Sequence, residues 1–193
     1  PTELQNGLYG YWSFCGNAND SAQDNNGDTV GPNLTTDRFG NENSAYNFDG
    51  TDDYIALNEP FFDGNSSVSE FSYSTWMYVD GYPDVPKSIN TKEGYWRTIG
   101  ISMLPSGAIR FGGSQPSPYA YHSIETDENI INTQEWNHIA VTFNNSALKI
   151  FINGTLAAST TTEISSWNFE WLAQGNSTNT NLIGASNPAS GTT

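Results

Sequence analysis

The fold of this chain is decided by the stretch Asp37-Arg-Phe-Gly-Asn-Glu-Asn-Ser-Ala-Tyr-Asn-Phe-Asp-Gly-Thr-Asp-Asp-Tyr-Ile-Ala-Leu57. Residues 45–49 alternate in character, which is the two-residue period of a β-strand. Asp49-Gly-Thr-Asp52 has the composition of a turn, because glycine adopts positive φ and aspartate side chains bond nearby backbone groups. Residues 54–57 then resume a β-prone run. The stretch therefore predicts a β-hairpin whose turn is crowded with carboxylates.

Short sequence blocks on both sides of this stretch occur in the same order as in a known family. They are Gly7-Leu-Tyr-Gly-Tyr-Trp-Ser-Phe14, Gly16-Asn-Ala-Asn-Asp20, Phe71-Ser-Tyr-Ser-Thr-Trp76, Trp136-Asn-His-Ile-Ala-Val-Thr-Phe143, Lys149-Ile-Phe-Ile-Asn-Gly154 and Leu182-Ile-Gly-Ala-Ser186. Together with the hairpin they resemble LamG-like (laminin G-like) jelly-roll domains of the concanavalin A-like lectin/glucanase superfamily. The resemblance implies that residues 1–193 form a single LamG-like domain. Its expected fold is all-β, a two-sheet antiparallel jelly-roll sandwich.

Periodicity along the rest of the chain indicates where the strands and loops lie. Strands are expected at residues 7–14, 68–79, 97–103, 108–111, 136–144, 148–152 and 181–185. The dipeptide Asn153-Gly154 predicts a type I′ turn after the strand at residues 148–152. Irregular segments, rich in Asn, Gly, Pro or Ser, are expected at residues 17–32, 81–96, 112–121 and 167–181.

The chain is strongly acidic, with 21 Asp and Glu residues against 6 Lys and Arg residues and a net charge of −15. A protein of this charge is repelled by phosphate backbones, so nucleic acid is not an expected partner. Anionic membranes and polyanionic polysaccharides are disfavoured for the same reason. Cations, neutral glycans and basic protein surfaces remain as partner classes.

The sequence also indicates the compartment of the protein. Cys15 is the only cysteine, which excludes an internal disulfide. Because it follows the first expected strand, we expect a buried and inert thiol. No run of about 18 apolar residues is present, so membrane insertion is not expected. The sequence starts at Pro1 without a signal peptide, and we expect a mature domain that is secreted or at the cell surface.

The first candidate site is an acidic loop, Asp20-Ser-Ala-Gln-Asp-Asn-Asn-Gly-Asp28. It presents hard oxygen ligands on a flexible segment, as Ca²⁺ requires. The resemblance implies a structural calcium here, held by Asp20 and by the following loop groups Asp24, Asn26 and Gly27. This family commonly has Ser-Gly-Asn after the aspartate, so the register of the ligands stays open. The alternative is an Asx-rich surface loop bonded to its own backbone.

The second candidate site is a set of aromatic residues expected in loops or at loop edges. Flat aromatic faces suit the C–H surfaces of sugars, and exposed aromatic side chains suggest binding. The alternative is that these rings cap the ends of the sandwich. The set consists of Tyr82, Tyr95, Trp96, Tyr119, Tyr121, Trp167 and Trp171.

Catalysis is the third possibility, because relatives in this superfamily include glycoside hydrolases with two carboxylates on one strand face. Glu125 and Asp127 alternate as such a face requires, but Asn129 stands where a third acidic residue would be expected. His122 and His138 have no serine or cysteine nearby in the context of a nucleophile. We therefore expect no catalytic site.

These observations favour a non-catalytic extracellular recognition module that binds a neutral glycan or an extracellular protein, with a structural calcium. The alternative is a structural subunit of an extracellular fibre or assembly. In LamG-like domains a closing strand resembling Gly-x-Ile-Asp-Asp-x-x-Ile-Tyr-Asn follows the segment that matches residues 182–186, and residues 187–193 contain none of it. Another copy of the chain, or a strand-donating chain, would then cover the open sheet edge. A sequence boundary or a disordered C-terminus is the other explanation.

Overall fold

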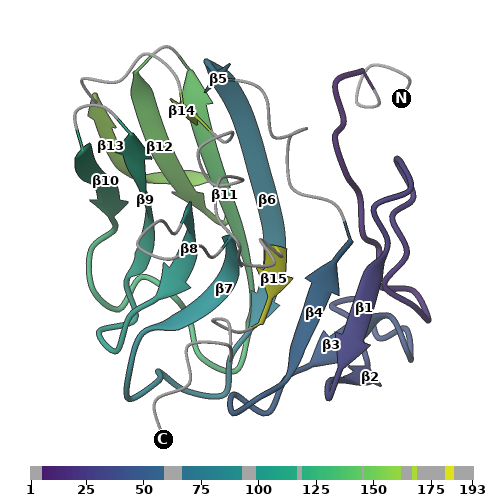
Figure 1. Cartoon of the computed structure of the whole chain (residues 1–193). Helices are drawn as coiled ribbons and strands as arrows, with labels where there is room; N and C mark the ends of the chain where they lie inside the picture. The colour runs from purple at the N-terminus through teal and green to yellow at the C-terminus, as the bar shows by residue number, and fades with distance from the viewer. Residues whose placement is uncertain are drawn as a thin grey trace, which may run out of the picture.

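The computed structural model describes residues 6–58, 67–92, 99–116, 119–144, 146–161, 167–168 and 181–184. These residues form strands, turns and loops, and none of them is helical. Two antiparallel sheets face each other and enclose the main core (Figure 1). The predicted all-β, two-sheet antiparallel sandwich is therefore confirmed. No helix long and apolar enough to cross a membrane occurs in the described part of the chain.

The sheets combine strands that lie far apart in the sequence. The larger sheet has seven strands in the spatial order β1 (Gly27–Val30), β4 (Tyr54–Leu57), β15 (Asn181–Ile183), β7 (Lys87–Lys92), β8 (Ile99–Met103), β9 (Ile109–Pro116) and β10 (Tyr119–Glu125). The smaller sheet has four, in the order β13 (Thr155–Thr161), β12 (Ala147–Ile152), β11 (Trp136–Asn144) and β6 (Glu70–Tyr78). Two short pairs join β14 (Trp167–Asn168) to β5 (Ser67–Val68) and β2 (Asn33–Thr35) to β3 (Ala45–Asn47).

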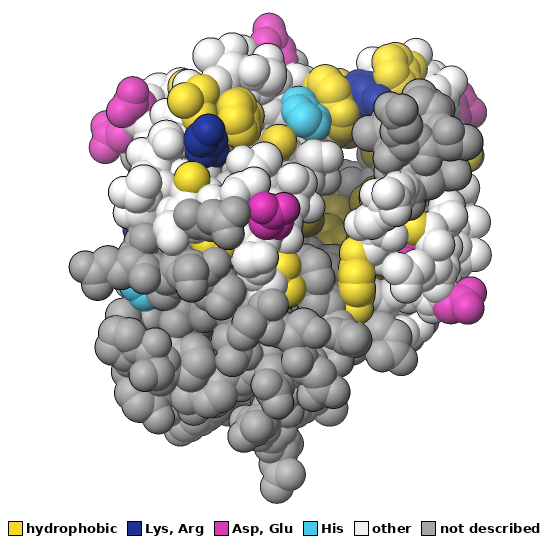
Figure 2. Space-filling view, turned by 90° about the horizontal axis from the view of Figure 1, so that it is seen from above, with side chains coloured by type: hydrophobic (Ala, Val, Ile, Leu, Met, Phe, Trp, Pro, Cys, Tyr) yellow, Lys and Arg dark blue, Asp and Glu magenta, His cyan; other side chains and the backbone are white. Residues whose placement is uncertain are grey.

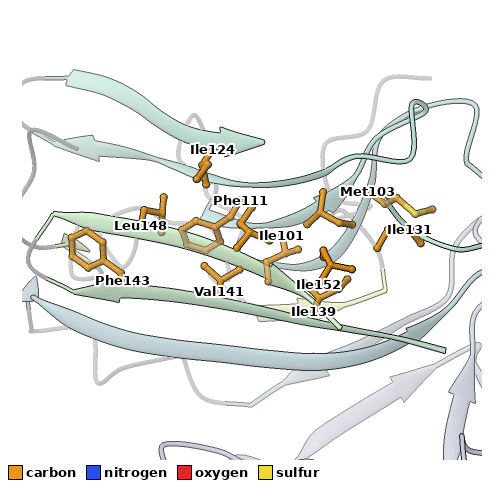
Figure 3. Packing of buried hydrophobic residues seen from close by; sticks show 12 residues of the cluster. Ile101, Met103, Phe111, Ile124, Ile131, Ile139, Val141, Phe143, Leu148 and Ile152 are labelled. Atoms are coloured by element: carbon orange, nitrogen blue, oxygen red, sulfur yellow. The ribbon is translucent and has the colours of Figure 1, made fainter. Parts of the chain in front are cut away.

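The main core lies between the two sheets, because alternate side chains of each strand point inward. The small sheet contributes buried aliphatic side chains from β11 and β12, and the large sheet contributes them from β8, β9 and β10. Figure 3 shows these side chains meeting between the sheets. The buried members of this cluster on these strands are Ile101, Met103, Ile109, Phe111, Ile124, Ile139, Val141, Phe143, Leu148, Ile150 and Ile152.

The predicted hairpin of residues 136–144 and 148–152 is confirmed as β11 and β12. The turn that follows it is also confirmed, since Asn153 (φ 51°) and Gly154 (φ 80°) both have the positive φ of a type I′ turn. The strand expected at residues 68–79 is present as β6, after the short strand β5. The last expected strand is present as β15, which lies in the middle of the large sheet.

The hairpin predicted from the stretch 37–57 is wrong in its pairing, although both of its strands exist. Strand β3 pairs with β2, whereas β4 pairs with β1 and β15. The turn between them is held by Asp53, whose Oδ2 accepts a hydrogen bond from the Asp49 amide at 2.8 Å. Asp53 also lies directly on Gly31, where an added Cβ would be only 1.9 Å from its Oδ1. This contact fixes the aspartate beside the end of β1 and directs β4 into the large sheet.

The strand predicted at residues 7–14 is also wrong, because only Trp12 forms an isolated bridge, to Asp20. Gly7 (φ 80°) and Phe14 (φ 57°) have left-handed backbone, which interrupts an extended strand. The Tyr11 amide bonds to the Asp20 side chain instead of to a neighbouring strand. The large sheet ends at β1, which lies inside the predicted loop of residues 17–32.

Three further expectations are corrected. Residues 87–92 of the predicted irregular segment form β7, and residues 112–121 hold the end of β9 and the start of β10. The glycine, serine and proline residues of 112–116 obscure the end of β9, and β7 lies in a segment that also holds prolines and glycines. Cys15 is exposed rather than buried, because it lies in a turn and not at the end of a strand.

A second, smaller cluster packs the N-terminal part of the chain against the large sheet. Ala18, Ile55 and Leu57 are its buried centre, with the partly buried Trp12, Phe14, Tyr46, Phe48 and Ile183 around them. Phe48 lies on Gly184 (φ 94°), where an added Cβ would be 2.3 Å from the phenylalanine ring. Glycine is therefore required there for both its backbone conformation and the space it leaves.

The closing strand is expected to pair beside residues 7–14, which form only the isolated bridge at Trp12. Among the described strands, β6 pairs with β11 on one side only. Residues 185–193 lie outside the described residues, so the expected lack of a closing strand stays a prediction.

A pair of neighbouring substitutions tests the core. Leu148 is fully buried, whereas Lys149 is on the opposite face of the same strand. We expect Leu148→Ala to lower the free energy of unfolding by about 2–5 kcal/mol, because it leaves a cavity between the sheets. Lys149→Ala should change it by less than about 0.5 kcal/mol. Urea unfolding followed by tryptophan fluorescence measures both, and equal losses would contradict this core.

Candidate functional site

The first exposed site lies on the outer face of β8, β9 and β10. Apolar residues of these strands point inward, so the residues between them form two outer rows across the sheet. We call this surface the Tyr121 face. Its residues are Gly100, Gly112, Ser123, Ser102, Arg110, Glu125 and Tyr121.

Tyr121 is the exposed aromatic residue of this face, with 55% of its surface accessible. Its hydroxyl oxygen lies 2.8 Å from the position that a Cβ on Gly112 would take. The tyrosine therefore leans from β10 across β9, which only a glycine at position 112 permits without a shift of the ring. With Gly100 opposite Gly112, two residues without side chains form a floor of backbone next to the ring, and Gly112 itself is buried beside the tyrosine hydroxyl.

Polar groups border this floor. Arg110 Nε donates to Glu125 Oε1 at 2.7 Å, and both side chains are partly exposed. Glu125 is one of the two carboxylates weighed as a catalytic pair, and here it is neutralised by Arg110. Asp127 lies after the strand, where its carbonyl accepts a hydrogen bond from the Thr126 hydroxyl at 3.0 Å. Hydroxyl, guanidinium and carboxylate groups of this kind bind sugar hydroxyls by hydrogen bonds.

Of the other residues in the predicted aromatic set, only Tyr82 has a described side chain. Tyr82 packs against the main core, and its hydroxyl donates to the Ile131 carbonyl at 2.9 Å. This is the environment of a residue that supports the core. Tyr119 and Trp167 belong to β10 and β14, but their side chains are outside the described ones. Tyr95, Trp96 and Trp171 lie outside the described residues.

A second exposed aromatic surface lies on the outer face of the small sheet. Trp76 and Tyr78 of β6 are opposite His138 and Trp136 of β11. The ring centroids of Trp76 and His138 are 5.0 Å apart, and those of Tyr78 and Trp136 are 5.8 Å apart. Figure 2 shows exposed hydrophobic side chains around a histidine, with a basic side chain next to them. With two loop residues, this surface forms the Trp76 face, consisting of Arg38, Phe39, Trp76, Tyr78, Trp136 and His138.

The sequence-based search for aromatic sites missed the Trp76 face, because it considered only loops and loop edges. The signal was nevertheless present in β6. Ser72, Ser74 and Trp76 share one face of that strand, and a face with two serines is expected to be in water. The contact of Arg38 with Trp76 joins residues from different parts of the chain, and periodicity does not reveal it.

The acidic loop brings together two of the four predicted calcium ligands. Asp20 donates its backbone amide to Asn26 Oδ1 at 3.0 Å, and its own Oδ1 accepts hydrogen bonds from the Tyr11 and Ala22 amides, both at 2.8 Å. Asp24 is exposed, and Gly27 belongs to β1.

The other carboxylate oxygen of Asp20, Oδ2, is buried and has no hydrogen-bond partner among the described residues. A buried carboxylate oxygen without a donor is costly, and a bound cation would remove that cost. This oxygen therefore fits the calcium that the resemblance implies.

A tighter acidic cluster lies in the turn after β3, where carboxylate oxygens of Asp49, Asp52 and Asp53 are within 4.8 Å of one another. The sequence analysis noted the carboxylates of this turn but did not assign them a metal. Asp53 Oδ2 and Asp49 Oδ1 already accept backbone hydrogen bonds inside the turn. The hydrogen bonds of the turn therefore explain why these three carboxylates lie close together.

Comparison with known families identifies the class of the protein. A family model described as concanavalin A-like lectin/glucanases superfamily (Laminin_G_3) matches residues 49–193. The chain belongs to this superfamily, which confirms the resemblance drawn from the sequence. No curated protein sequence matches the chain.

Solved structures share the fold at low sequence identity. The botulinum neurotoxin serotype D binding domain matches with a TM-score of 0.60 and 15% identity over 90% of this chain and 43% of its own length. A botulinum neurotoxin type C structure, described with two ganglioside molecules, gives 0.60 and 16% over 98% of this chain and 46% of its own. This chain thus spans less than half of those toxin chains. Domain 4 of the arabinanase AbnA from Geobacillus stearothermophilus, in complex with arabinotriose, gives 0.57 and 18% over 92% and 83%.

These likenesses confirm the concanavalin A-like jelly-roll fold.

The contacts in the Trp76 face predict how the imidazole of His138 titrates. Partial burial lowers the pKa of His138 below its ordinary value of about 6.5, and the charge of Arg38 lowers it further. In Arg38→Gln we expect the pKa of His138 to rise, yet to stay below that ordinary value because burial remains. An NMR titration of the imidazole protons measures the change, with Arg110→Gln as the control. An unchanged pKa in Arg38→Gln would contradict the placement of Arg38.

Proposed function

We propose that this domain is a non-catalytic glycan-recognition module that binds a neutral glycan on the Tyr121 face. The observation that carries the proposal is the exposed ring of Tyr121, which leans across Gly112 and is bordered by serine hydroxyls and the Arg110–Glu125 pair. A sugar ring presents an apolar C–H face and a polar edge of hydroxyls, and this surface offers both complements.

The electrostatics of the face support a neutral ligand. Arg110 and Glu125 cancel each other's charge, and the whole chain carries −15. A polyanionic chain would therefore meet repulsion with little local compensation. The arabinotriose complex of AbnA domain 4, a domain of similar fold, gives independent support for a small neutral glycan.

The non-catalytic part of the proposal is supported by the ion pair at Glu125. Arg110 Nε donates a hydrogen bond to Glu125 Oε1 at 2.7 Å, so this carboxylate is already engaged within the protein. Charged residues make up only 14% of the sequence, which is usual for extracellular β proteins. A secreted or cell-surface location is therefore part of the proposal.

Calcium is the proposed cofactor. Asp20 Oδ2 is the first ligand, with oxygen atoms of Asp24, Asn26 and Gly27 as the further donors expected from the family resemblance. The ion would neutralise a buried carboxylate and fasten the loop between Trp12 and β1 against the second hydrophobic cluster.

The alternative, a structural subunit completed by a strand from another copy or another chain, stays a prediction. The feature that favours it is the open edges of both sheets, where β1, β10, β13 and β6 each have one described partner. Light scattering after size exclusion decides it, since a stable monomer would exclude strand exchange between copies. An extracellular protein as the ligand of the Tyr121 face is the remaining partner class.

The glycan proposal is tested on an array of neutral oligosaccharides that includes arabinotriose. We expect at least one to bind, and Tyr121→Ala to weaken that binding about tenfold, the loss expected for one stacking ring. Tyr121→Phe should retain most of the affinity, because the ring is kept. Isothermal titration calorimetry measures the change.

The control for this substitution is Tyr11→Ala, because Tyr11 is 54% exposed and lies outside the Tyr121 face. Two results would reject the proposal: binding that is equally weakened by Tyr11→Ala, or an array on which no neutral oligosaccharide is retained.

The calcium proposal is tested by thermal unfolding. At a concentration one hundred times the Kd, calcium should stabilise the fold by about 2.7 kcal/mol. For a domain of this size each kcal/mol raises the melting temperature by about 2–4 °C. In Asp20→Asn the calcium-dependent rise should disappear, whereas the exposed Asp28→Asn should keep it.

The same experiment separates a metal ligand from a purely structural aspartate. With excess chelator, Asp20→Asn should be no less stable than the native chain, because it removes an unpaired buried charge. A native melting temperature that is identical in calcium and in chelator would contradict the proposed site.

A further inference from the structure

The Trp76 face combines exposed rings with one cation. Phe39 is 73% exposed, Trp76 43% and Tyr78 44%. The guanidinium carbon of Arg38 lies 4.2 Å from the Phe39 ring centroid and 4.5 Å from the Trp76 ring centroid. Contact with two rings restricts the orientation of an exposed arginine, which reduces the entropy that binding would cost.

A tight turn presents this arginine. The Oδ1 of Asp37 accepts hydrogen bonds from the Phe39 and Asn41 amides at 2.8 and 2.9 Å, and Oδ2 accepts one from Asn41 Nδ2 at 3.0 Å. The bond from the Asn41 side chain is the main reason why the pKa of Asp37 is lowered. The nearest carboxylate in the sequence is therefore engaged in the turn.

The donor groups of Arg38 are available to a ligand. No hydrogen bond or ion pair joins Arg38 to any described residue, whereas Arg110 is paired with Glu125 and Lys87 donates to the Gly50 carbonyl at 2.7 Å. A guanidinium offers five N–H donors in a planar fork that matches a carboxylate. The charge of Arg38 lowers the pKa of its neighbour Asp37, but no ion pair joins the two side chains.

We propose that the Trp76 face is a second carbohydrate site, which binds a single sugar unit that carries a carboxylate. The carboxylate is bound by the fork of Arg38, and the C–H face of the sugar lies on the exposed surfaces of Trp76 and Tyr78. These two residues are two positions apart on one face of β6, so their side chains are about 7 Å apart, which is close to the width of one sugar ring.

The charge of the surface selects an acidic sugar with one carboxylate over a polyanion. Arg38 supplies one full positive charge, and the net charge of the domain repels further anionic groups. The site is on the opposite sheet from the Tyr121 face and does not depend on glycan binding there.

The test uses methyl glucuronoside and its neutral counterpart methyl glucoside, each titrated into the domain at pH 7 and followed by NMR. We expect the acidic sugar to bind about tenfold more tightly, because charge-assisted hydrogen bonds add to the stacking. In Arg38→Gln the two sugars should bind equally. In Trp76→Ala both should bind more weakly.

Two controls make the result specific. Lys149→Gln removes another cation from the outer face of the same sheet and should leave the preference unchanged. Binding is read from the His138 imidazole signals, which report on the Trp76 face, so Tyr121→Ala on the opposite sheet should leave the preference unchanged. Failure of the neutral-glycan proposal and failure of this one are therefore distinguishable. The methyl signals of the buried core residues Ile139 and Leu148 confirm that each variant is folded.

Three outcomes would overturn the proposal. The first is equal affinity for the acidic and the neutral sugar in the native domain. The second is a preference that survives Arg38→Gln. The third is Arg38-dependent binding of an acidic hexapeptide without binding of the glucuronoside, which would assign the surface to a protein partner.

Discussion

The structure depends on one constraint: the strands that enclose the main core bury one face and leave the other toward water. Leu148, Ile150 and Ile152 meet this requirement on β12, and Ile139, Val141 and Phe143 do so on β11. Because the inner face is filled by aliphatic residues, the outer residues of the same strands contribute little to the core. Side chains placed there can serve recognition without a large cost in stability. Both candidate surfaces are outer faces of this kind.

Short polar side chains form hydrogen bonds with the backbone of loops, which have no partner strands in the sheets. Asp20, Asp37 and Asp53 each accept hydrogen bonds from backbone amides in loops. Asn137 is fully buried and donates to the Asn132 and Glu135 carbonyls at 2.8 and 3.0 Å. These acidic side chains therefore stabilise loops of the fold. The high net charge excludes ligand classes, but it does not by itself identify a binding surface.

The strongly alternating strands could be predicted from the sequence, because their period is set by the burial of one face. The separate partners of β3 and β4 could not be predicted, because they depend on Asp53 lying against Gly31, a contact between residues distant in the sequence. Strand β7 was hidden because it lies between proline- and glycine-containing loops, and the second half of β9 was hidden by its own glycine, serine and proline residues. For the same reason Tyr121 was selected as a loop residue although it lies on a strand, whereas Arg38 and Trp76 were not selected at all. Proximity across the chain, rather than residue type, defines these surfaces.

The position of β15 has a consequence for how the chain is made. In the described part of the large sheet, this strand alone joins β4 to β7, through the pairs Leu182–Ala56 and Leu182–Thr91. During synthesis, residues 54–57 and 87–92 leave the ribosome long before residues 181–183. Until then the two parts of the sheet each have an open edge at the place where β15 will insert, and such edges associate with other chains. The nascent domain is thus most exposed to misassembly, and most dependent on chaperones, just before its last described strand emerges.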